Sequence, residues 1–292
     1  MKLNVSKPIL ALICYVVLAI TNPSAAHACP TIGGLIDYNC DQQHKMVFIG
    51  DSIVRGVGDE RHDGNGGYPL RIAKAFPLST VVNQGQPGFS TRRLLRLLTK
   101  RLKNDPNSTL RTEAKNADLV GIAIGTNDFW EHSAPELTVR NIKRIVALVR
   151  DELEKDLGVA PLMAVATLTP TKRAYQRGFI NSVNALLKQQ NSASLPVRLF
   201  YDSIPLGFIS FDGLHPTSPG YTALSKIAVK FIQGSAQKLC SANRHDNDGD
   251  GIYDKFENSL FGTDPQILDT DGDGISDGDE VFSLHTNPLT AN

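Results

Sequence analysis

Residues 46–53 read Met-Val-Phe-Ile-Gly-Asp-Ser-Ile, an apolar run that ends at a glycine and passes into two polar residues. A short apolar run bounded by a turn residue is typical of a buried strand. Similar runs recur at 80–82, 119–124, 162–166 and 197–200. Helical patterns lie between and after them, at 69–76, 91–103, 135–157, 179–189 and 221–232. Because alternating strands and helices form a parallel sheet covered on both faces, the sequence predicts an α/β domain with five parallel strands.

The charges divide the chain into two regions. The whole sequence has 30 Lys+Arg and 30 Asp+Glu, but residues 241–292 hold ten Asp and two Glu against only Arg244 and Lys255. This segment therefore carries a charge of −10 and the first 240 residues carry +10, which indicates two modules. We expect the α/β domain at residues 41–240 and a separate module at 241–292. The composition, 41% hydrophobic and 21% charged, excludes wholesale disorder. No long basic run suited to nucleic acid is present.

The N-terminus has the layout of a secretory signal. Lys2 and Lys7 precede an apolar run at 9–20, and the small residues around Ala26 and Ala28 follow it. Twelve apolar residues are too few to span a bilayer, which needs about 20. We therefore expect residues 1–28 to be cleaved and the protein to be secreted or periplasmic, with no transmembrane segment left. Anchoring through a lipid on Cys29 is the alternative, although His27 fits a lipoprotein signal poorly.

Export permits disulfides, and three cysteines remain after cleavage: Cys29, Cys40 and Cys240. The last predicted helix starts at the carboxyl ends of the strands, so it must finish near Cys240 at their amino ends. Cys40 precedes the first strand at that same end. We therefore predict a Cys40–Cys240 disulfide, with Cys29–Cys40 as the alternative.

Reactive groups follow several of the predicted strands. Ser52 comes after the first strand, and Asp212 and His215 come after the fifth. A serine hydroxyl needs a base to remove its proton as it attacks, and His215 can be that base. Asp212, three residues earlier, can hold the imidazole in the required tautomer. Since the carboxyl ends of parallel strands meet at one edge, we expect these groups to form a catalytic triad.

An acyl oxyanion also needs fixed hydrogen-bond donors. The backbone N–H groups of Ser52 and Gly88 and the side-chain amide of Asn127 are candidates, because all follow predicted strands. Each residue taken alone has an ordinary structural explanation, such as a helix cap or a turn. Their order along the chain favours a catalytic set.

The sequence resembles the GDSL-type esterases, or SGNH hydrolases. Their conserved blocks match Gly50-Asp51-Ser52-Ile53, Gly88 with the preceding Asn83, Gly125-Thr126-Asn127-Asp128, and Asp212-Gly213-Leu214-His215-Pro216. The resemblance covers about 200 residues and has Ile53 where leucine is usual. It implies a three-layer α/β/α flavodoxin-like fold and ester hydrolysis through an acyl-enzyme, without a cofactor for catalysis. It makes Ser52 the nucleophile, His215 the base, Asp212 its orienter, and Gly88 and Asn127 oxyanion donors.

The ester substrate is less defined by sequence, and the oligomeric state is not defined at all. Phe129 and Trp130 follow Asn127, where they either line an acyl pocket or pack the loop. We expect a small-molecule, lipid or sugar ester as the substrate. A carbohydrate O-deacetylase is one alternative function, and a calcium-dependent surface protein with an inactive hydrolase domain is another.

The acidic segment contains two copies of a calcium-loop pattern, 23 residues apart. Oxygen-bearing residues stand at alternate positions, a glycine at position 6 lets the chain bend, and a glutamate closes the loop at position 12. The expected ligands are Asp246, Asp248, Asp250, Ile252 through its carbonyl, Asp254 and Glu257, then Asp269, Asp271, Asp273, Ile275 through its carbonyl, Asp277 and Glu280. No entering helix precedes either loop, and the segment resembles bacterial thrombospondin type 3 repeats. That resemblance implies two structural Ca²⁺ sites without a catalytic role.

Overall fold

The computed structural model describes residues 31–33, 35–37, 43–59, 66–157, 160–242, 247–252, 254, 257, 261–284 and 286–291. The predicted signal segment, Cys29, Cys40, the side chain of Cys240 and Asp246 lie outside the described residues. Both predicted disulfide pairings therefore remain predictions. No helix in the described part of the chain is long and apolar enough to cross a membrane.

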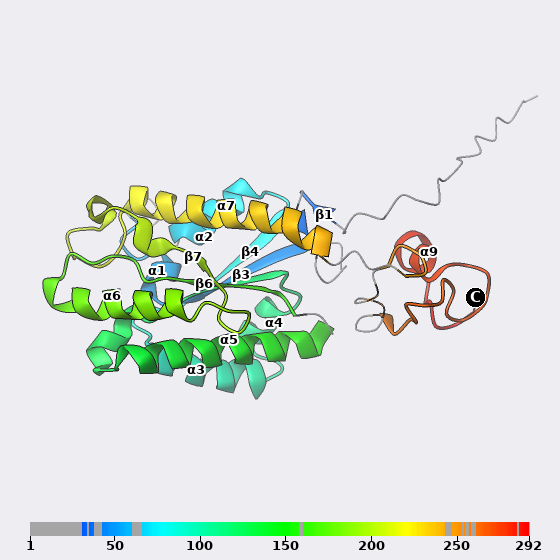
Figure 1. The fold of residues 1–292 in the computed structure, drawn as a ribbon, viewed down its shortest axis with the longest axis horizontal. Coiled ribbons are helices and arrows are strands. Elements are labelled where there is room, and N and C mark those ends of the chain that lie inside the picture. The colour runs from blue at the N-terminus through cyan, green and yellow to red at the C-terminus, as the bar shows by residue number, and fades with distance from the viewer. Residues whose placement is uncertain are drawn as a thin grey trace, which may run out of the picture.

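A five-stranded parallel sheet forms the centre of the larger module (Figure 1). Its strands are β3 (His44–Gly50), β4 (Ser79–Gly85), β5 (Leu119–Ala123), β6 (Leu162–Ala166) and β7 (Val197–Leu199). They are arranged in the order β4-β3-β5-β6-β7, which is the flavodoxin-like order. The predicted α/β class and strand number are confirmed. A short hairpin of β1 (Thr31–Ile32) and β2 (Leu35–Ile36), which the sequence did not predict, precedes the sheet.

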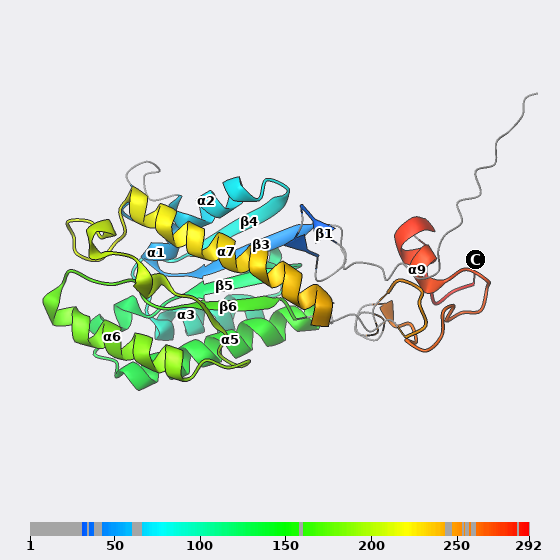
Figure 2. The same ribbon diagram turned by 45° about the horizontal axis from the view of Figure 1, so that its top comes forward.

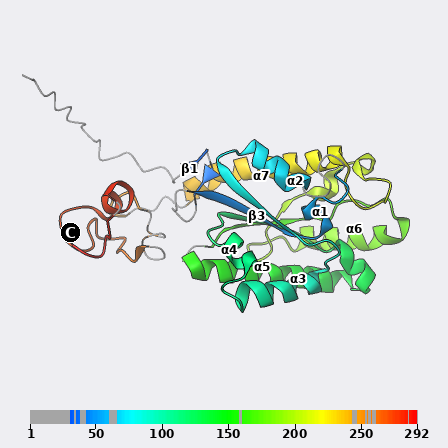
Figure 3. The ribbon, with the colours of Figure 1, turned by 180° about the vertical axis from the view of Figure 1, so that it is seen from behind.

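Helices cover both faces of the sheet, as Figures 1 and 2 show. The helices α3 (Thr91–Leu98), α5 (Pro135–Leu157) and α6 (Ala174–Gln189) pack on one face, where α3 continues as η1 (Thr99–Lys103). The helices α2 (Gly67–Ala75) and α7 (Ser218–Ala242) pack on the other. Figure 3 shows the same separation from behind and places the short α4 (Thr109–Ala114) near α5.

Each face of the sheet buries its own apolar cluster. Alternate residues of β3 point to opposite faces, so Val47 packs with α3 and α5 while Phe48 packs with α2 and α7. The predicted apolar stripe of α5, which includes Ile142 and Val146, is fully buried. This burial on both faces explains why the strands read as nearly continuous apolar runs.

Three helices start earlier than predicted, and the smallest difference is at α2, which begins at Gly67 where the predicted helix was 69–76. The sequence pattern indicates a helix at 179–189, but α6 begins at Ala174, because its first turn is polar and lacks apolar periodicity. The helix predicted at 221–232 spans Ser218–Ala242 and has Pro219 in its first turn, where the missing N–H costs no helical hydrogen bond. The structure also adds α1 (Ser52–Arg55), α4 and the 3-10 helices η2 (Thr126–Glu131), η3 (Tyr201–Ser203) and η4 (Leu206–Phe208).

Candidate active site

Ser52 is held at the start of α1, directly beyond β3. Asp51 caps this helix, and its Oδ1 atom accepts a hydrogen bond of 2.9 Å from the Ile53 backbone N–H. Gly50 allows the tight turn, because a Cβ atom there would lie 1.9 Å from the Ala123 carbonyl oxygen. The sequence thus places the Ser52 hydroxyl at the edge of the sheet on a short, capped helix, where the side chain is mostly buried.

The structure brings the three predicted triad residues together. His215 Nε2 lies 2.8 Å from Ser52 Oγ, and His215 Nδ1 is hydrogen-bonded to Asp212 Oδ2. If Nδ1 carries the proton, Nε2 is left as the acceptor for the serine hydroxyl. This is the arrangement that a nucleophile, its base and an orienting carboxylate require.

Asp212 is fixed by its own loop. Its Oδ1 atom accepts hydrogen bonds from the backbone N–H groups of Leu214 and His215 and from the Ser210 hydroxyl, at 2.8, 3.0 and 2.7 Å. Partial burial would raise the pKa of Asp212, but the hydrogen bonds from His215, Ser210 and the backbone outweigh burial and hold that pKa well below its usual value. The carboxylate therefore remains ionised and can stabilise a histidine cation.

The loop that follows α1 packs against the His215 side chain. A Cβ atom on Gly58 would lie 3.0 Å from His215 Cβ, so the two residues pack closely. Tyr221 of α7 donates a 2.6 Å hydrogen bond to the Val57 carbonyl. The Asp59 carboxylate, which directly follows Gly58, forms a buried ion pair with Arg71 of α2. These contacts tie the loop to α7, which begins three residues after His215.

The predicted oxyanion donors lie on neighbouring segments. Gly88 has φ +75° in a turn closed by a 3.1 Å hydrogen bond from Phe89 N–H to the Gln86 carbonyl. This left-handed position favours glycine. The Asn127 side-chain amide donates a 3.0 Å hydrogen bond to the Phe89 carbonyl, which links η2 to the Gly88 turn.

Asp128 joins these segments, a role that the sequence interpretation missed. Its buried carboxylate accepts hydrogen bonds from Thr91 N–H at 2.8 Å, from the Thr91 hydroxyl at 2.5 Å and from the Thr138 hydroxyl at 3.3 Å. Burial raises the pKa of Asp128 and the Thr91 hydrogen bonds lower it, with a net rise. The sequence motif includes Asp128, but nothing in the pattern identifies Thr91 and Thr138 as its hydrogen-bond partners.

Phe129 and Trp130 have different environments. Phe129 packs against Trp130, Tyr175 and Phe179, with ring centroids 5.3 to 5.8 Å apart. The Trp130 side chain is 54% exposed. Phe129 therefore packs the loop, which was one of the two predicted roles, while Trp130 faces solvent on the same segment as Asn127.

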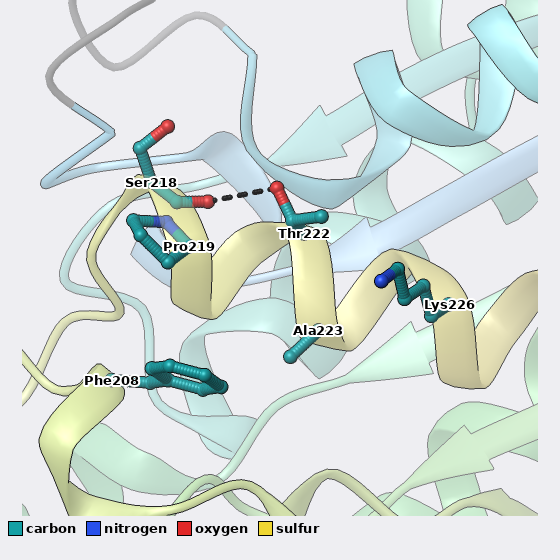
Figure 4. Close-up of a pocket in the computed structure, with 6 residues that line it drawn as sticks. All are labelled: Phe208, Ser218, Pro219, Thr222, Ala223 and Lys226. Atoms are coloured by element: carbon teal, nitrogen blue, oxygen red, sulfur yellow. Dashed lines mark hydrogen bonds between the residues drawn. The ribbon is translucent and has the colours of Figure 1, made fainter.

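An open pocket of about 380 Å³ lies beside the first turns of α7 (Figure 4). Figure 4 shows the Thr222 hydroxyl bonded to the Ser218 carbonyl, with the Phe208 ring across the pocket from Thr222 and Ala223. Its lining residues are Phe208, Ser218, Pro219, Thr222, Ala223 and Lys226. None belongs to the predicted catalytic set, so this pocket is separate from the Ser52 hydroxyl.

The acidic module gathers carboxylates in both predicted calcium loops. Ligand atoms of Asp248, Asp250 and Glu257 lie within 4.8 Å of one another, as do those of Asp269, Asp271 and Asp273. Glu257 is fully buried, and its Oε2 atom has no hydrogen-bond partner among the described residues. Burial and the charges of Asp248 and Asp250 raise the pKa of Glu257 to about 8. A buried group of hard oxygen atoms suits a calcium ion.

The remaining predicted calcium ligands that the structure describes lie outside these two clusters and contact other groups of the protein. Asp254 Oδ1 accepts a 2.9 Å hydrogen bond from Asn247 N–H, and Asp277 Oδ1 accepts one of 2.9 Å from Thr270 N–H. Neither position-9 carboxylate belongs to a cluster. Glu280 is buried and bonded to the Thr286 hydroxyl, as Glu257 is to that of Thr263. The backbone N–H groups of Ile252 and Ile275 donate to the aspartates at position 5 of each loop.

Sequence and structure comparisons match both modules. Residues 48–223, more than half of the chain, match the GDSL-like Lipase/Acylhydrolase family. Residues 246–266 and 269–291 each match the Bacterial TSP3 repeat. No curated protein matches the sequence significantly.

Several solved structures are similar to the chain. A member of the lipolytic protein G-D-S-L family from Veillonella parvula is 15% identical over 64% of this chain and 97% of its own, with a TM-score of 0.50. A lipase from a goat rumen metagenome is 21% identical over 66% of this chain and 100% of its own, with a TM-score of 0.51. A catalytic mutant of an acetylxylan esterase from Geobacillus stearothermophilus is 17% identical over 65% of this chain and 94% of its own, with a TM-score of 0.46. The family match over residues 48–223 confirms the predicted family and the carboxylic ester hydrolase class. The first two of these structures confirm the predicted fold.

Proposed function

The chain belongs to the GDSL-like lipase/acylhydrolase family, and from this premise we propose that it hydrolyses carboxylic esters through an acyl-enzyme formed on Ser52. The observation that carries the proposal is the continuous hydrogen-bonded line from Ser52 Oγ to His215 Nε2, and from His215 Nδ1 to Asp212. A surface protein with an inactive hydrolase domain would have no need for this complete arrangement.

In the first half of the reaction, Ser52 Oγ attacks the ester carbonyl as His215 takes its proton. The ionised Asp212 stabilises the resulting histidine cation. The oxyanion that develops is stabilised by the backbone N–H groups of Ser52 and Gly88 and by the Asn127 amide. The Asn127 amide nitrogen has two N–H donors, so it can keep its contact with the Phe89 carbonyl through one and donate the other to the oxyanion.

His215 then gives this proton to the leaving alcohol oxygen as the ester C–O bond breaks, which completes the first half and leaves the acyl group on Ser52. In the second half the acyl-enzyme is hydrolysed. A water molecule then gives a proton to His215 as it attacks the acyl carbonyl. This second oxyanion collapses as the bond between Ser52 Oγ and the acyl carbon breaks and His215 gives its proton back to Oγ, which releases the carboxylic acid and restores the serine hydroxyl. No metal or cofactor takes part in these proton transfers.

We propose that two Ca²⁺ ions, one in each acidic loop, stabilise the C-terminal module. Asp248, Asp250 and Glu257 would hold the first ion, and Asp269, Asp271 and Asp273 the second. Bound calcium supplies only neutralising charge, since neither loop contains a residue of the proposed catalytic set. The signal-like segment at 1–28 supports secretion or a periplasmic location, where calcium is available.

The function is tested with a panel of nitrophenyl esters of increasing acyl length and with acetylated sugars. We expect wild-type protein to turn over at least one ester, and Ser52→Ala to turn over none. A phosphonate ester should label one site per chain in wild type and none in Ser52→Ala. Ser194→Ala, which changes an exposed serine in the loop before β7, is the matched control and should keep full activity and labelling. Normal turnover by Ser52→Ala would refute the mechanism.

A further inference from the structure

Exposed aromatic side chains gather at the edge of the sheet that carries the triad. Trp130 follows β5, Tyr175 follows β6 and Phe211 follows β7, so three neighbouring strands each lead to one of them. Trp130 is 54% exposed, Tyr175 is 60% exposed and Phe211 is fully exposed. We call these three residues the aromatic rim.

Ring contacts and a hydrogen bond connect the rim to the catalytic groups. Trp130 and Tyr175 have ring centroids 5.8 Å apart, and Trp130 lies on the same 3-10 helix as Asn127. Arg173, which precedes α6, donates a 2.8 Å hydrogen bond to the Asp212 carbonyl, next to Phe211. The rim therefore extends along one side of the predicted active site.

Exposed apolar side chains are concentrated at this end of the catalytic module. Among its described residues, Leu78 is the only exposed large hydrophobic residue at the amino ends of the strands. Phe200 and Leu206 are also exposed and follow β7. Apolar groups that gather on one face of a soluble protein mark an interaction site.

Basic side chains lie beside the aromatic rim. Lys172, Arg173 and Arg177 lie at or just before the start of α6, beside Tyr175. Arg92 and Arg93 lie at the start of α3 and both pair with Glu131, which is next to Trp130. Arg92 and Arg93 share the single carboxylate of Glu131, which leaves positive charge beside the rim that is complementary to an anionic surface.

We propose that the aromatic rim docks the enzyme on an anionic lipid–water interface, which presents lipid esters to Ser52. Aromatic side chains are favoured at such interfaces because an apolar ring with a polar edge suits the headgroup region. A polysaccharide is less well matched, because the Trp130 and Tyr175 rings meet at 64° and form no flat platform for successive sugar rings. This proposal rests on the proposed esterase function and names its substrate class.

The single tryptophan of the sequence provides the assay, since Trp130 is the only one present. Ser52→Ala protein that starts at Cys29 is titrated with phosphatidylglycerol vesicles and, separately, with phosphatidylcholine vesicles. This form lacks the apolar run at 9–20, which would itself bind lipid. We expect a blue shift of Trp130 emission with phosphatidylglycerol, a weaker one with phosphatidylcholine, and weaker binding to phosphatidylglycerol at high salt.

Matched variants locate the binding surface. In the Ser52→Ala background, Tyr175→Ala and Phe211→Ala should each weaken partition into phosphatidylglycerol vesicles by about tenfold. Leu78→Ala, an equally exposed position at the other end of the sheet, should leave it unchanged. Arg177→Glu should weaken binding more than Lys230→Glu, which changes an exposed cation on α7. Thermal unfolding of each variant establishes that it is folded.

The proposal is overturned if vesicles cause no emission shift, or if Leu78→Ala weakens binding as much as Phe211→Ala does. A shift caused by acetylated xylo-oligosaccharides but not by vesicles would also overturn it and assign the rim to a sugar. Turnover of soluble nitrophenyl acetate by wild-type protein is measured in parallel. Turnover without vesicle binding refutes the docking proposal alone, whereas absence of turnover on every ester refutes the proposed function.

Discussion

Replacing Arg71 with glutamine should destabilise the protein strongly, because this one guanidinium joins three segments around the active site. It forms a bidentate ion pair with Asp59, with N···O distances of 2.5 and 3.2 Å. It also donates to the Gly67 carbonyl, to the hydroxyl and carbonyl of Ser218, and to the Thr222 hydroxyl. The Arg71 side chain is 13% exposed and that of Asp59 is fully buried.

The burial of the Arg71–Asp59 ion pair determines how much stability the substitution removes. Removing one partner of a buried ion pair typically costs about 3–5 kcal/mol, because the other charge stays buried. We therefore expect Arg71→Gln to lower the free energy of unfolding by about 3–5 kcal/mol. Arg71→Lys keeps the charge but has no planar fork, so it should recover less than half of this loss. The exposed pair of Arg101 and Asp105 is the control, and Arg101→Gln should cost at most about 1 kcal/mol.

Urea denaturation followed by circular dichroism measures these differences, and a double-mutant cycle with Asp59→Asn isolates the pair. Under conditions where Arg71→Gln remains folded, we expect its kcat to fall about tenfold with little change in KM. The reason is that Asp59 directly follows Gly58, which packs against His215. A loss of stability below about 1 kcal/mol for Arg71→Gln, or equal effects in Arg71→Gln and Arg101→Gln, would refute this reasoning.

Three further predictions concern the active site and calcium. Asn127→Ala should lower turnover by about 10²–10³, the usual cost of one oxyanion donor, and normal turnover would exclude Asn127 from that role. Burial raises the pKa of Asp51 to about 7, so the native state keeps a proton that the unfolded chain releases. The contribution of Asp51 to stability should therefore fall by up to about 4 kcal/mol as pH rises from about 4 to 7. Urea denaturation at each pH should show a smaller decline in stability for Asp51→Asn than for wild type. Removing calcium with a chelator should speed proteolysis after residue 242 while esterase activity persists, and loss of activity would show that the modules are coupled.

The strands and the close approach of Ser52, Asp212 and His215 could be predicted because each leaves a local signal. A strand buried on both faces, such as β3, must be apolar throughout, and Ser52 and His215 each stand within a short motif. The resemblance to a known family then assigned roles to those residues. The geometry of parallel strands was enough to predict that distant motifs meet at one edge.

The supporting contacts could not be predicted, because their partners are far apart in sequence and chemically ordinary. Arg71 lies 147 positions from Ser218, and Asp128 lies 37 from Thr91. Any exposed helix can contain an arginine at such a place, and no local pattern indicates that it is buried. The exposure of Trp130 beside the half-buried Phe129 has the same origin, since it depends on where α6 packs.

In the predicted calcium loops, too, the sequence motif alone does not distinguish the residues that would bind the ion from those that have other partners. Two variants of the second loop test this difference. The sequence pattern assigns Asp271 and Asp277 equally as ligands, but only Asp271 lies in the carboxylate cluster. Asp277 instead accepts hydrogen bonds from the backbone N–H and hydroxyl of Thr270, at 2.9 and 2.6 Å. Asparagine keeps an acceptor oxygen, so Asp277→Asn should change calcium affinity by less than about threefold, whereas Asp271→Asn removes a ligand charge and should weaken it at least about tenfold. Calorimetric titration of both variants decides the matter: equal losses of affinity would mean that Asp277 is a ligand and that its contact with Thr270 gives way to the ion.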